Sequence, residues 1–387
     1  MSEPRARWWQ LALLTTTMLL GMAVWLAASA VGPVLAASLH LSTGATGWLT
    51  STVQLGFVAG TLIVAILNLA DLLPSRWFVA AAAVAAAIAN AGLLVADSYG
   101  PALASRFCTG VALAGVYPPA MKMAATWFRD RRGLAIGCLV AALTAGKSLP
   151  YLLSGIDVLS LDIAVGVPSL MALGAAALVA VGYRDGPYLV PPRAFSWGLV
   201  GSVLRESGVR RATGGYLGHM WELYAFWAWI PGFLAAALAA QGRLEAMAKF
   251  WAFVIVAVGA VGAVWGGLAS DRFGRPLVTR VALLVSGTCC LLSPWLFSGP
   301  FWLLVVFGMI WGIAVIADSA QFSAMVSEFA PPHAVGTALT LQTSLGFLLT
   351  IATIQGVPVL ANAFGWQWSM AVLGLGPAAG MWAMRRL

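Results

Sequence analysis

Residues 101–155 read PALASRFCTGVALAGVYPPAMKMAATWFRDRRGLAIGCLVAALTAGKSLPYLLSG, and they place cations where a membrane disfavours them. The break RDRRG at 129–133 separates two apolar runs, each long enough to span a bilayer. The first run contains Arg106 and Lys122, and the second contains Lys147. A charge at membrane depth costs roughly 3 kcal/mol or more, so such residues usually face a polar cavity or a partner inside a helical bundle. The stretch therefore indicates a chain that surrounds a path through a membrane.

The composition of the whole chain agrees with this interpretation. It is 61% hydrophobic and 9% charged, with a mean hydropathy of +0.91, far from the values of soluble domains. The net charge of +8 does not predict nucleic-acid binding, because the arginines fall in short breaks rather than on one dense basic face. The four cysteines lie in apolar runs and give no disulfide pattern. Three scattered histidines cannot build a multi-histidine centre, so we expect no metal, no cofactor and no enzyme.

Apolar runs between short polar breaks predict an all-α integral membrane protein with twelve spans. The first run resembles a signal peptide, but it continues past a small-residue site at 28–30, so we interpret it as an uncleaved span. The one long linker, 184–212, ends in SWGLVGSVLRESGVRR, which could form a short amphipathic helix on the membrane surface. The spans are expected near 8–37, 46–70, 77–96, 101–128, 133–156, 163–183, 213–240, 247–270, 276–297, 301–328, 336–360 and 366–384.

Basic residues between the spans predict the orientation of the chain. With the N-terminus inside, nearly all of them fall on the inner side, including Arg131, Arg132 and Arg205. The outer side holds only Arg243 and Lys249. The positive-inside rule therefore predicts two cytoplasmic termini, and we expect a multi-pass protein of a bacterial inner membrane.

The two halves of the chain repeat one another. GPVLAASL at 32–39 is similar to PGFLAAAL at 231–238, Asp71 aligns with Asp271, and Gly133 aligns with Gly336, all at an offset near 200. Such a repeat predicts two six-helix bundles, 1–183 and 213–387, with a binding site at their interface.

The stretch GLASDRFGR at 267–275 resembles the loop motif of the major facilitator superfamily, and the resemblance extends over essentially the whole chain. Gly267 would let two helices approach closely, and Asp271 could face the positive N-terminal end of a neighbouring helix. The resemblance implies that this loop latches the inner gate and that helices one, four, seven and ten line the cavity. The first-half copy, LNLADLLPSR at 67–76, keeps the acid but lacks both glycines and the first basic residue.

A second motif lies in the fourth span. RFCTG at 106–110 resembles the superfamily's fourth-helix motif, and its extension GVALAGVYPPAM at 110–121 is most similar to the organic anion symporters. Helical rise puts Arg106 and Lys147 at a common depth, roughly 8–9 Å from the outer face. We expect both to attract a substrate anion. The alternative is that Arg106 bonds helix carbonyls and that Lys147 snorkels outward.

Span seven supplies the opposite charge. Tyr216, His219, Glu222, Phe226 and Trp229 recur at three- and four-residue steps and share one helix face. Glu222 is expected near the midplane, where a carboxyl group can carry a proton that the histidine one turn away exchanges. The alternatives are a structural ion pair for the acid, and lipid or helix packing rather than substrate stacking for the aromatic residues.

These patterns predict a transporter that alternates between inward- and outward-facing states. Our hypothesis is proton-coupled uptake of a small organic anion by a monomer, whose partners are the anion, protons and lipid but no nucleic acid. Export of a metabolite or drug, and a non-transporting receptor or scaffold, are alternatives. Asp318 in span ten is a second proton candidate or a gate partner of Lys122. The predicted residues are Arg106, Lys147 and Trp229 for substrate, Glu222, His219 and Asp318 for protons, and Asp71, Lys122, Gly267, Asp271, Arg272, Gly274 and Arg275 for gating.

Overall fold

The computed structural model describes residues 3–128, 131–154, 161–188, 195–243 and 247–387, and in these ranges every regular element is a helix. The first half contains α1 (Glu3–Met22), α2 (Ala27–Ala30), α3 (Gly32–Ser38), α4 (Thr43–Ile66), α5 (Leu69–Leu72), α6 (Ser75–Ala91), η1 (Gly92–Leu94), α7 (Tyr99–Leu113), α8 (Tyr117–Ala125), α9 (Arg132–Ser154) and α10 (Leu161–Gly182). The second half contains α12 (Ser207–Ala240), α13 (Met247–Phe273), α14 (Arg275–Phe297), α15 (Phe301–Ala317), α16 (Ser319–Phe329), η3 (Pro332–Ala334), α17 (Val335–Phe364), α18 (Trp366–Ser369), η4 (Ala371–Gly374) and α19 (Leu375–Ala383).

Nine helical segments of the described ranges are long and apolar enough to cross a membrane. The three remaining predicted spans, near 8–37, 101–128 and 366–384, are present but are each divided into shorter helices. In the fourth span α7 ends at Leu113 and α8 begins at Tyr117. The break precedes Pro118 and Pro119, whose rings remove two N–H donors and clash with carbonyls one turn earlier. Apolar composition alone does not distinguish a broken span from a continuous one.

The linker also differs from its prediction. Residues 196–211 were expected to form one amphipathic helix, but they contain η2 (Trp197–Leu199) and α11 (Val200–Arg205), and the remainder belongs to α12. The helix that contains span seven, α12, therefore begins at Ser207, six residues before the predicted start of the span near 213. Arg193 and part of the 129–133 break lie outside the described residues.

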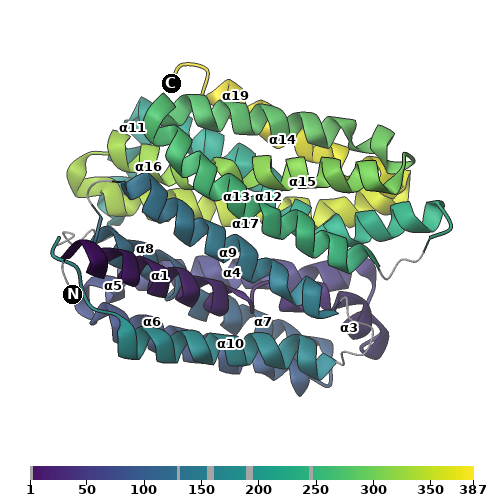
Figure 1. Ribbon diagram of the computed structural model, residues 1–387, viewed down its shortest axis with the longest axis horizontal. Helices are drawn as coiled ribbons and strands as arrows, with labels where there is room; N and C mark the ends of the chain where they lie inside the picture. Colours follow the sequence, from purple (N-terminus) through teal and green to yellow (C-terminus); the bar gives the residue numbers. More distant parts are fainter. Residues whose placement is uncertain (1–2, 129–130, 155–160, 189–194, 244–246) are drawn as a thin grey trace.

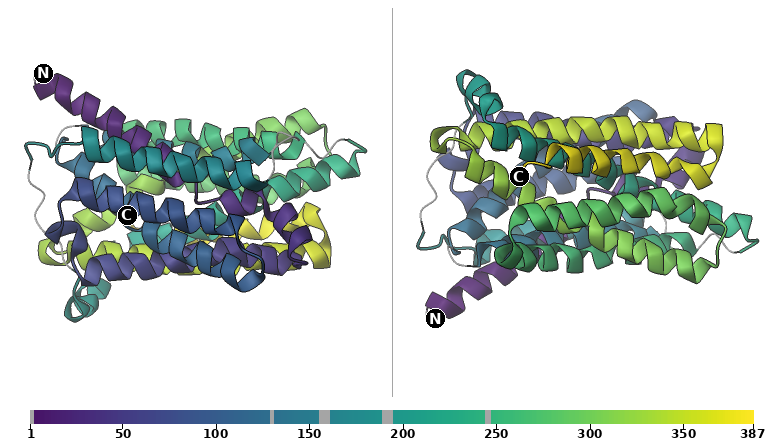
Figure 2. Two further views of the ribbon diagram at one scale, coloured as in Figure 1. Left: turned by 90° about the horizontal axis from the view of Figure 1, so that it is seen from below. Right: turned by 90° about the horizontal axis from the view of Figure 1, so that it is seen from above.

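The helices lie lengthwise in two layers, the first half below and the second half above in Figure 1. Within the first half α4 packs on α7 and α10 packs on α6, while in the second half α13 packs on α15 and α12 packs on α17. Two long contacts join the halves, α9 with α13 and α4 with α17. Both chain ends point toward the same end of the bundle (Figures 1 and 2). We call this the basic end, because it carries Arg131, Arg132, Arg272 and Arg275, and we call the other the opposite end.

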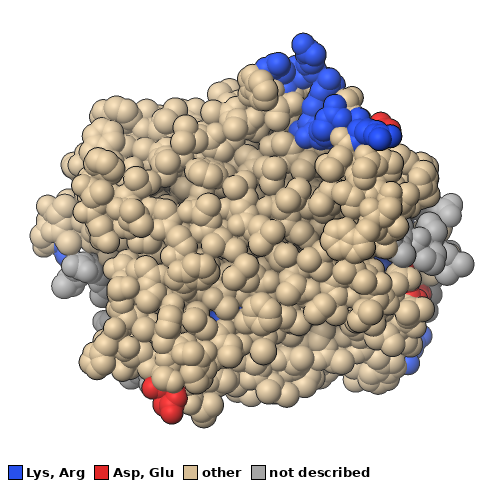
Figure 3. Space-filling model, turned by 180° about the vertical axis from the view of Figure 1, so that it is seen from behind, with Lys and Arg blue, Asp and Glu red and all other residues tan. Residues whose placement is uncertain are grey.

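The outer flank of the bundle is apolar. In Figure 3 the visible face is almost free of charged side chains, and the blue basic residues gather at the basic end. Large side chains such as Leu170, Val181 and Trp295 are well exposed along the helices. Such a belt is suited to lipid, because the helical backbone already satisfies its own hydrogen bonds.

Candidate site between the two halves

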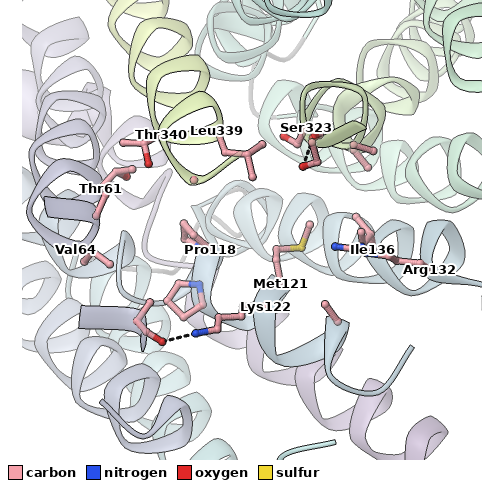
Figure 4. Close-up of a pocket in the computed structure, with 18 of the residues that line it drawn as sticks. Thr61, Val64, Pro118, Met121, Lys122, Arg132, Ile136, Ser323, Leu339 and Thr340 are labelled. Atoms are coloured by element: carbon pink, nitrogen blue, oxygen red, sulfur yellow. Dashed lines mark hydrogen bonds between the residues drawn. The ribbon is translucent and has the colours of Figure 1, made fainter. Parts of the chain in front are cut away.

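A cavity of about 430 Å³ lies between the halves at the basic end. It is built from both halves: α4 and α8 contribute on one side, and α16 and α17 contribute on the other (Figure 4). Apolar and small side chains dominate its wall. The lining residues include Thr61, Val64, Pro118, Met121, Lys122, Ile136, Ser323, Leu339 and Thr340.

The halves meet directly at the opposite end. Gln355 Nε2 on α17 donates to Ser51 Oγ on α4 at 2.9 Å. A Cβ atom on Gly47 would lie 3.3 Å from the ring of Trp229, so helix and indole are already in contact. Trp229 Nε1 donates to the Ile354 carbonyl at 2.8 Å. The path between the halves is thus closed by packing here, and Trp229, predicted to bind substrate, lies in this closure rather than in the cavity wall.

Lys147 lies deep at the interface, fully buried on α9. Its Nζ is 3.7 Å from the centroid of the Trp25 ring and 5.2 Å from that of Trp227, and it donates to Tyr224 Oη at 2.5 Å. No carboxylate among the described residues forms an ion pair with it. Cation–π contacts offset part of the desolvation of an ammonium group, but they leave its charge without a counter-ion.

The rings of Trp25, Tyr224 and Trp227 contact this cation, and Phe57 and Phe347 pack against these rings; we call the five side chains the aromatic cluster. The ring of Phe57 is 4.5 Å from that of Phe347 and 5.0 Å from that of Trp25. The first half contributes Trp25 and Phe57, and the second half contributes the other three. Phe57 is one helical turn from Thr61, which lines the cavity. The cluster therefore lies beyond the inner end of the cavity and separates it from the closed opposite end.

Arg106 does not face the cavity, which corrects its predicted orientation. Its guanidinium donates to the carbonyls of Val24 at 3.2 Å and Trp25 at 2.5 Å, and to Asn90 Oδ1 at 2.8 Å. Both carbonyls lie in the interruption between α1 and α2, so the cation supports backbone that no continuous helix holds. This is the alternative that the sequence left open. Arg106 reaches Lys147 only indirectly, because Trp25 bonds one cation through its carbonyl and contacts the other through its ring.

Glu222 points into the second half rather than toward the two cations. Its carboxylate accepts from Ser286 Oγ at 2.8 Å, from Trp311 Nε1 at 2.5 Å and from Cys290 Sγ at 3.3 Å. These donors come from α14 and α15, and the acid is fully buried. Neither predicted partner, Arg106 or Lys147, contacts it. The three donors hydrogen-bond the carboxylate entirely within the second half.

His219 and Asp318 form a second buried pair in the same half. His219 Nδ1 lies 2.8 Å from Asp318 Oδ1, at the junction between α15 and α16. The histidine therefore faces Asp318, whereas the sequence predicted that it would face Glu222. The predicted partnership of Asp318 with Lys122 is also wrong. Lys122 on α8 instead forms an ion pair with Asp71 on α5 at the mouth of the cavity, drawn as a dashed line in Figure 4.

The loop at 267–275 joins the two halves at the basic end. A Cβ atom on Gly267 would lie 2.6 Å from the Gly133 carbonyl, so only glycine permits this approach of α13 to α9. The Asp271 carboxylate packs against Gly133 at the start of α9, which is the predicted contact with a helix N-terminus. Gly274 has a φ of +85° just before α14, a conformation that favours glycine.

The two arginines of this loop differ in environment. Arg275 donates from Nε to Glu328 Oε1 and from a terminal nitrogen to Gln321 Oε1, both at 2.8 Å, and it lines the cavity. Arg272 lies at the surface, 5.2 Å from the centroid of the Phe273 ring. The gating roles of these residues remain predictions. Sequence reasoning missed Trp25 and Asn90, although an amide inside the apolar run 77–96 was a signal for the second.

Comparisons with known proteins agree with this geometry. The family model described as Major Facilitator Superfamily matches residues 13–255, and one described as Sugar (and other) transporter matches residues 215–384. A D-xylose transporter from Levilactobacillus brevis is 31% identical over 141 residues, which are 36% of this chain and 30% of that protein. MFS transporter asaE from Aspergillus flavus is 25% identical over 286 residues, which are 68% of this chain and 59% of that protein. The chain thus spans less than two thirds of the length of either relative.

The fold has a match among solved structures. A bacterial homolog of the human lysosomal transporter Spinster, in an inward-facing and occupied conformation, superposes with a TM-score of 0.70 at 17% identity. The superposition covers 98% of this chain and 97% of that one. It confirms the predicted all-helical fold of twelve spans.

Proposed function

Because the chain belongs to the major facilitator superfamily, whose members are membrane transporters and not enzymes, we propose that it takes up a small organic anion together with protons. Alternating access between the halves 1–183 and 213–387, joined by the linker 184–212, would carry the anion across. The observation that carries the proposal is Lys147, a buried cation between the halves with no carboxylate partner among the residues described.

A bound anion would complete the charge balance at Lys147. An unpaired buried ion is costly, whereas an ion pair with good geometry recovers much of the desolvation free energy. The aromatic cluster excludes water around Nζ, which strengthens the attraction to a carboxylate. Arg106 contributes to the same site by supporting the backbone at Trp25.

We assign the coupling proton to the second half. Glu222 lies inside the membrane-spanning bundle, and intramembrane acids commonly mark proton pathways. Asp318, next to His219, is the second candidate. The substrate site then lies between the halves and the proton site inside the second half, and binding at one would change affinity at the other by the same factor in both directions.

We place the basic end in the bacterial cytoplasm, in accordance with the positive-inside rule, so that this conformation faces inward. The Asp71–Lys122 pair and Arg275 of the loop 267–275 then line the cytoplasmic cavity. During the change to the outward-facing state we expect the contacts of Gly47 and Ser51 to separate and the cavity at the basic end to close. We propose that a monomer carries out the cycle.

One other substrate class has specific support. The likeness to a D-xylose transporter, together with a cluster of aromatic rings, favours a neutral sugar as the second candidate. Export of a metabolite or drug uses the same path in reverse. A receptor or scaffold role without transport is the least supported, since it gives buried Lys147 and Glu222 no task.

Proteoliposomes test the proposal. Purified protein is loaded with unlabelled carboxylates, and counterflow of labelled carboxylates and labelled D-xylose is measured with and without an imposed pH difference. We expect saturable carboxylate exchange, and accumulation when the outside is more acidic. Exchange of D-xylose without exchange of carboxylates would replace the anion by a sugar, and accumulation only under the reversed gradient would indicate export.

A further inference from the structure

One stripe of α4 faces the second half along the whole path. Gly47, Ser51, Gln54 and Thr61 are spaced by four, three and seven residues and therefore share a helix face. Gly47 contacts Trp229, and Ser51 bonds Gln355, both across the interface. Thr61 lines the cavity at the other end of the stripe. Gln54 must therefore face the path between the closure at the opposite end and the cavity.

The amide of Gln54 is fully buried, with 0% of the residue exposed. Neither its Nε2 nor its Oε1 has a hydrogen-bond partner in the part of the chain that the structure describes. Buried polar groups are nearly always hydrogen-bonded, and a buried amide without hydrogen-bond partners destabilises a protein. A side chain of this kind on the translocation path points to a ligand that supplies the missing bonds.

Two further polar atoms near the path share this state. Trp25 Nε1 and Thr61 Oγ1 are buried and have no hydrogen-bond partner within the described ranges. Gln54 precedes Phe57 by about 4.5 Å along the axis, the Phe57 ring is 5.0 Å from that of Trp25, and the Trp25 ring contacts Lys147. An amide, an indole N–H and an ammonium group thus border the same aromatic cluster.

We propose that Gln54 binds substrate directly, and that the substrate is a hydroxylated carboxylate. This inference rests on the proposed function, since the carboxylate is the group that pairs with Lys147. Hydroxyl groups both donate and accept, so they satisfy the amide oxygen and the amide nitrogen of Gln54 and can accept from Trp25 Nε1. A simple alkyl carboxylate satisfies Lys147 alone and leaves these groups unpaired.

Transport selectivity tests the assignment. Uptake of glycerate, D-gluconate and D-glucuronate is compared with that of propionate and hexanoate in proteoliposomes. We expect the wild type to prefer the hydroxylated acids at least about tenfold, the equivalent of one or two hydrogen bonds. Gln54→Met should remove most of this preference, because uptake of the hydroxylated acids should fall more than uptake of hexanoate. Gln54→Asn, which keeps a shorter amide, should lie between the two.

Gln10 provides the matched control. Its amide is also buried, but it bonds the Gly182 carbonyl at 3.1 Å and accepts from the Arg184 N–H at 3.3 Å, away from the path. Gln10→Met should keep the preference and lower the melting temperature. Gln54→Met should melt at or above the wild-type temperature in detergent without ligand, because it removes an unpaired amide.

The outcomes separate this inference from the proposed function. Equal uptake of hexanoate and D-gluconate by the wild type, no uptake of any hydroxylated acid, or an unchanged preference in Gln54→Met overturns the role of Gln54. Carboxylate uptake that survives Lys147→Met overturns the anion site instead. Uptake of D-xylose that depends on Gln54 but not on Lys147 retains the hydrogen-bonding role and rejects the carboxylate.

Discussion

The two halves of this protein bury charges of opposite sign. The first half buries Arg106 and Lys147, and the second half buries Glu222 and Asp318 beside His219. Among the described residues no ion pair joins a cation of one half to an acid of the other. Most of these charges are balanced locally: carbonyls surround Arg106, and three donors surround Glu222.

Lys147 is the exception in this comparison. It belongs to the first half, but its hydrogen-bond acceptor and most of its ring contacts come from the second. A charge balanced within one half is unaffected when the halves move apart, whereas the surroundings of Lys147 must change. The difference supports the proposal that substrate binding is sensed at the interface and that the coupling proton is held inside one half.

The largest expected effect follows from removing the interfacial cation. Lys147→Met should reduce carboxylate uptake roughly 100-fold, the value of a charge-assisted hydrogen bond in a site without water. The protein should fold at least as well, because an uncompensated buried cation is lost. Lys122→Met is the control, since its ion pair with Asp71 lies at the mouth. Near-normal carboxylate uptake in Lys147→Met would show that the interfacial cation does not bind the substrate.

The next variant tests the acid of the second half. Glu222→Gln keeps an acceptor for Trp311 and a donor for Ser286, so the bundle should remain intact. The variant should exchange substrate in counterflow but should fail to concentrate it when a pH difference is imposed. Both assays are run in the same vesicles, with Asp318→Asn in parallel. If Glu222→Gln accumulates substrate as well as the wild type does, the proton is carried by Asp318 or transport is not coupled to protons.

A smaller effect is expected at Arg106, whose charge is balanced within its half. Arg106→Lys keeps the charge but cannot reproduce the planar fork that reaches two carbonyls and Asn90. We expect a loss of about 1–3 kcal/mol in the free energy of unfolding. The affinity for substrate should also fall below that of the wild type, because Trp25 would be displaced. A thermal-shift assay and a binding titration measure the two. Unchanged values in both would show that charge alone matters.

The smallest effect is expected where the halves touch at the basic end. Asp271→Asn weakens a helix N-terminal interaction worth about 0.3–1 kcal/mol, so closure of this end should weaken by a few-fold at most. Labelling of a cysteine placed at Thr340, in the cavity wall, should rise. Asp97→Asn, at the exposed opposite end, serves as control. If neither labelling nor transport changes, the loop has no part in gating.

Sequence reasoning predicted the spans, the twofold repeat and the contact of Asp271 with a helix N-terminus, because composition and spacing record these features directly. It did not predict the partners of Lys122 and Asp318. Helical rise gives the depth of a residue, but it does not give the neighbour toward which its side chain points. The same limitation produced the wrong orientation of Arg106.

The aromatic cluster was only partly accessible to prediction. Tyr224 and Trp227 are two of the aromatic residues in the predicted span seven, yet their contact with Lys147 depends on how α9 packs on the second half. Packing of this kind across the interface is not encoded in the periodicity of either segment alone. Gln54 was visible as an amide in an apolar run, but its significance depends on the absence of a partner in the described structure.

The bonds from Arg106 to the carbonyls of Val24 and Trp25 also have a consequence for biogenesis. The ribosome delivers the first span long before the fourth. Until the fourth arrives, carbonyls at the interruption of the first span face lipid without the guanidinium, and an arginine alone in lipid is equally unfavourable. We therefore expect the first span to stay beside the insertion machinery until the fourth span has been made, and the two to enter the bilayer together.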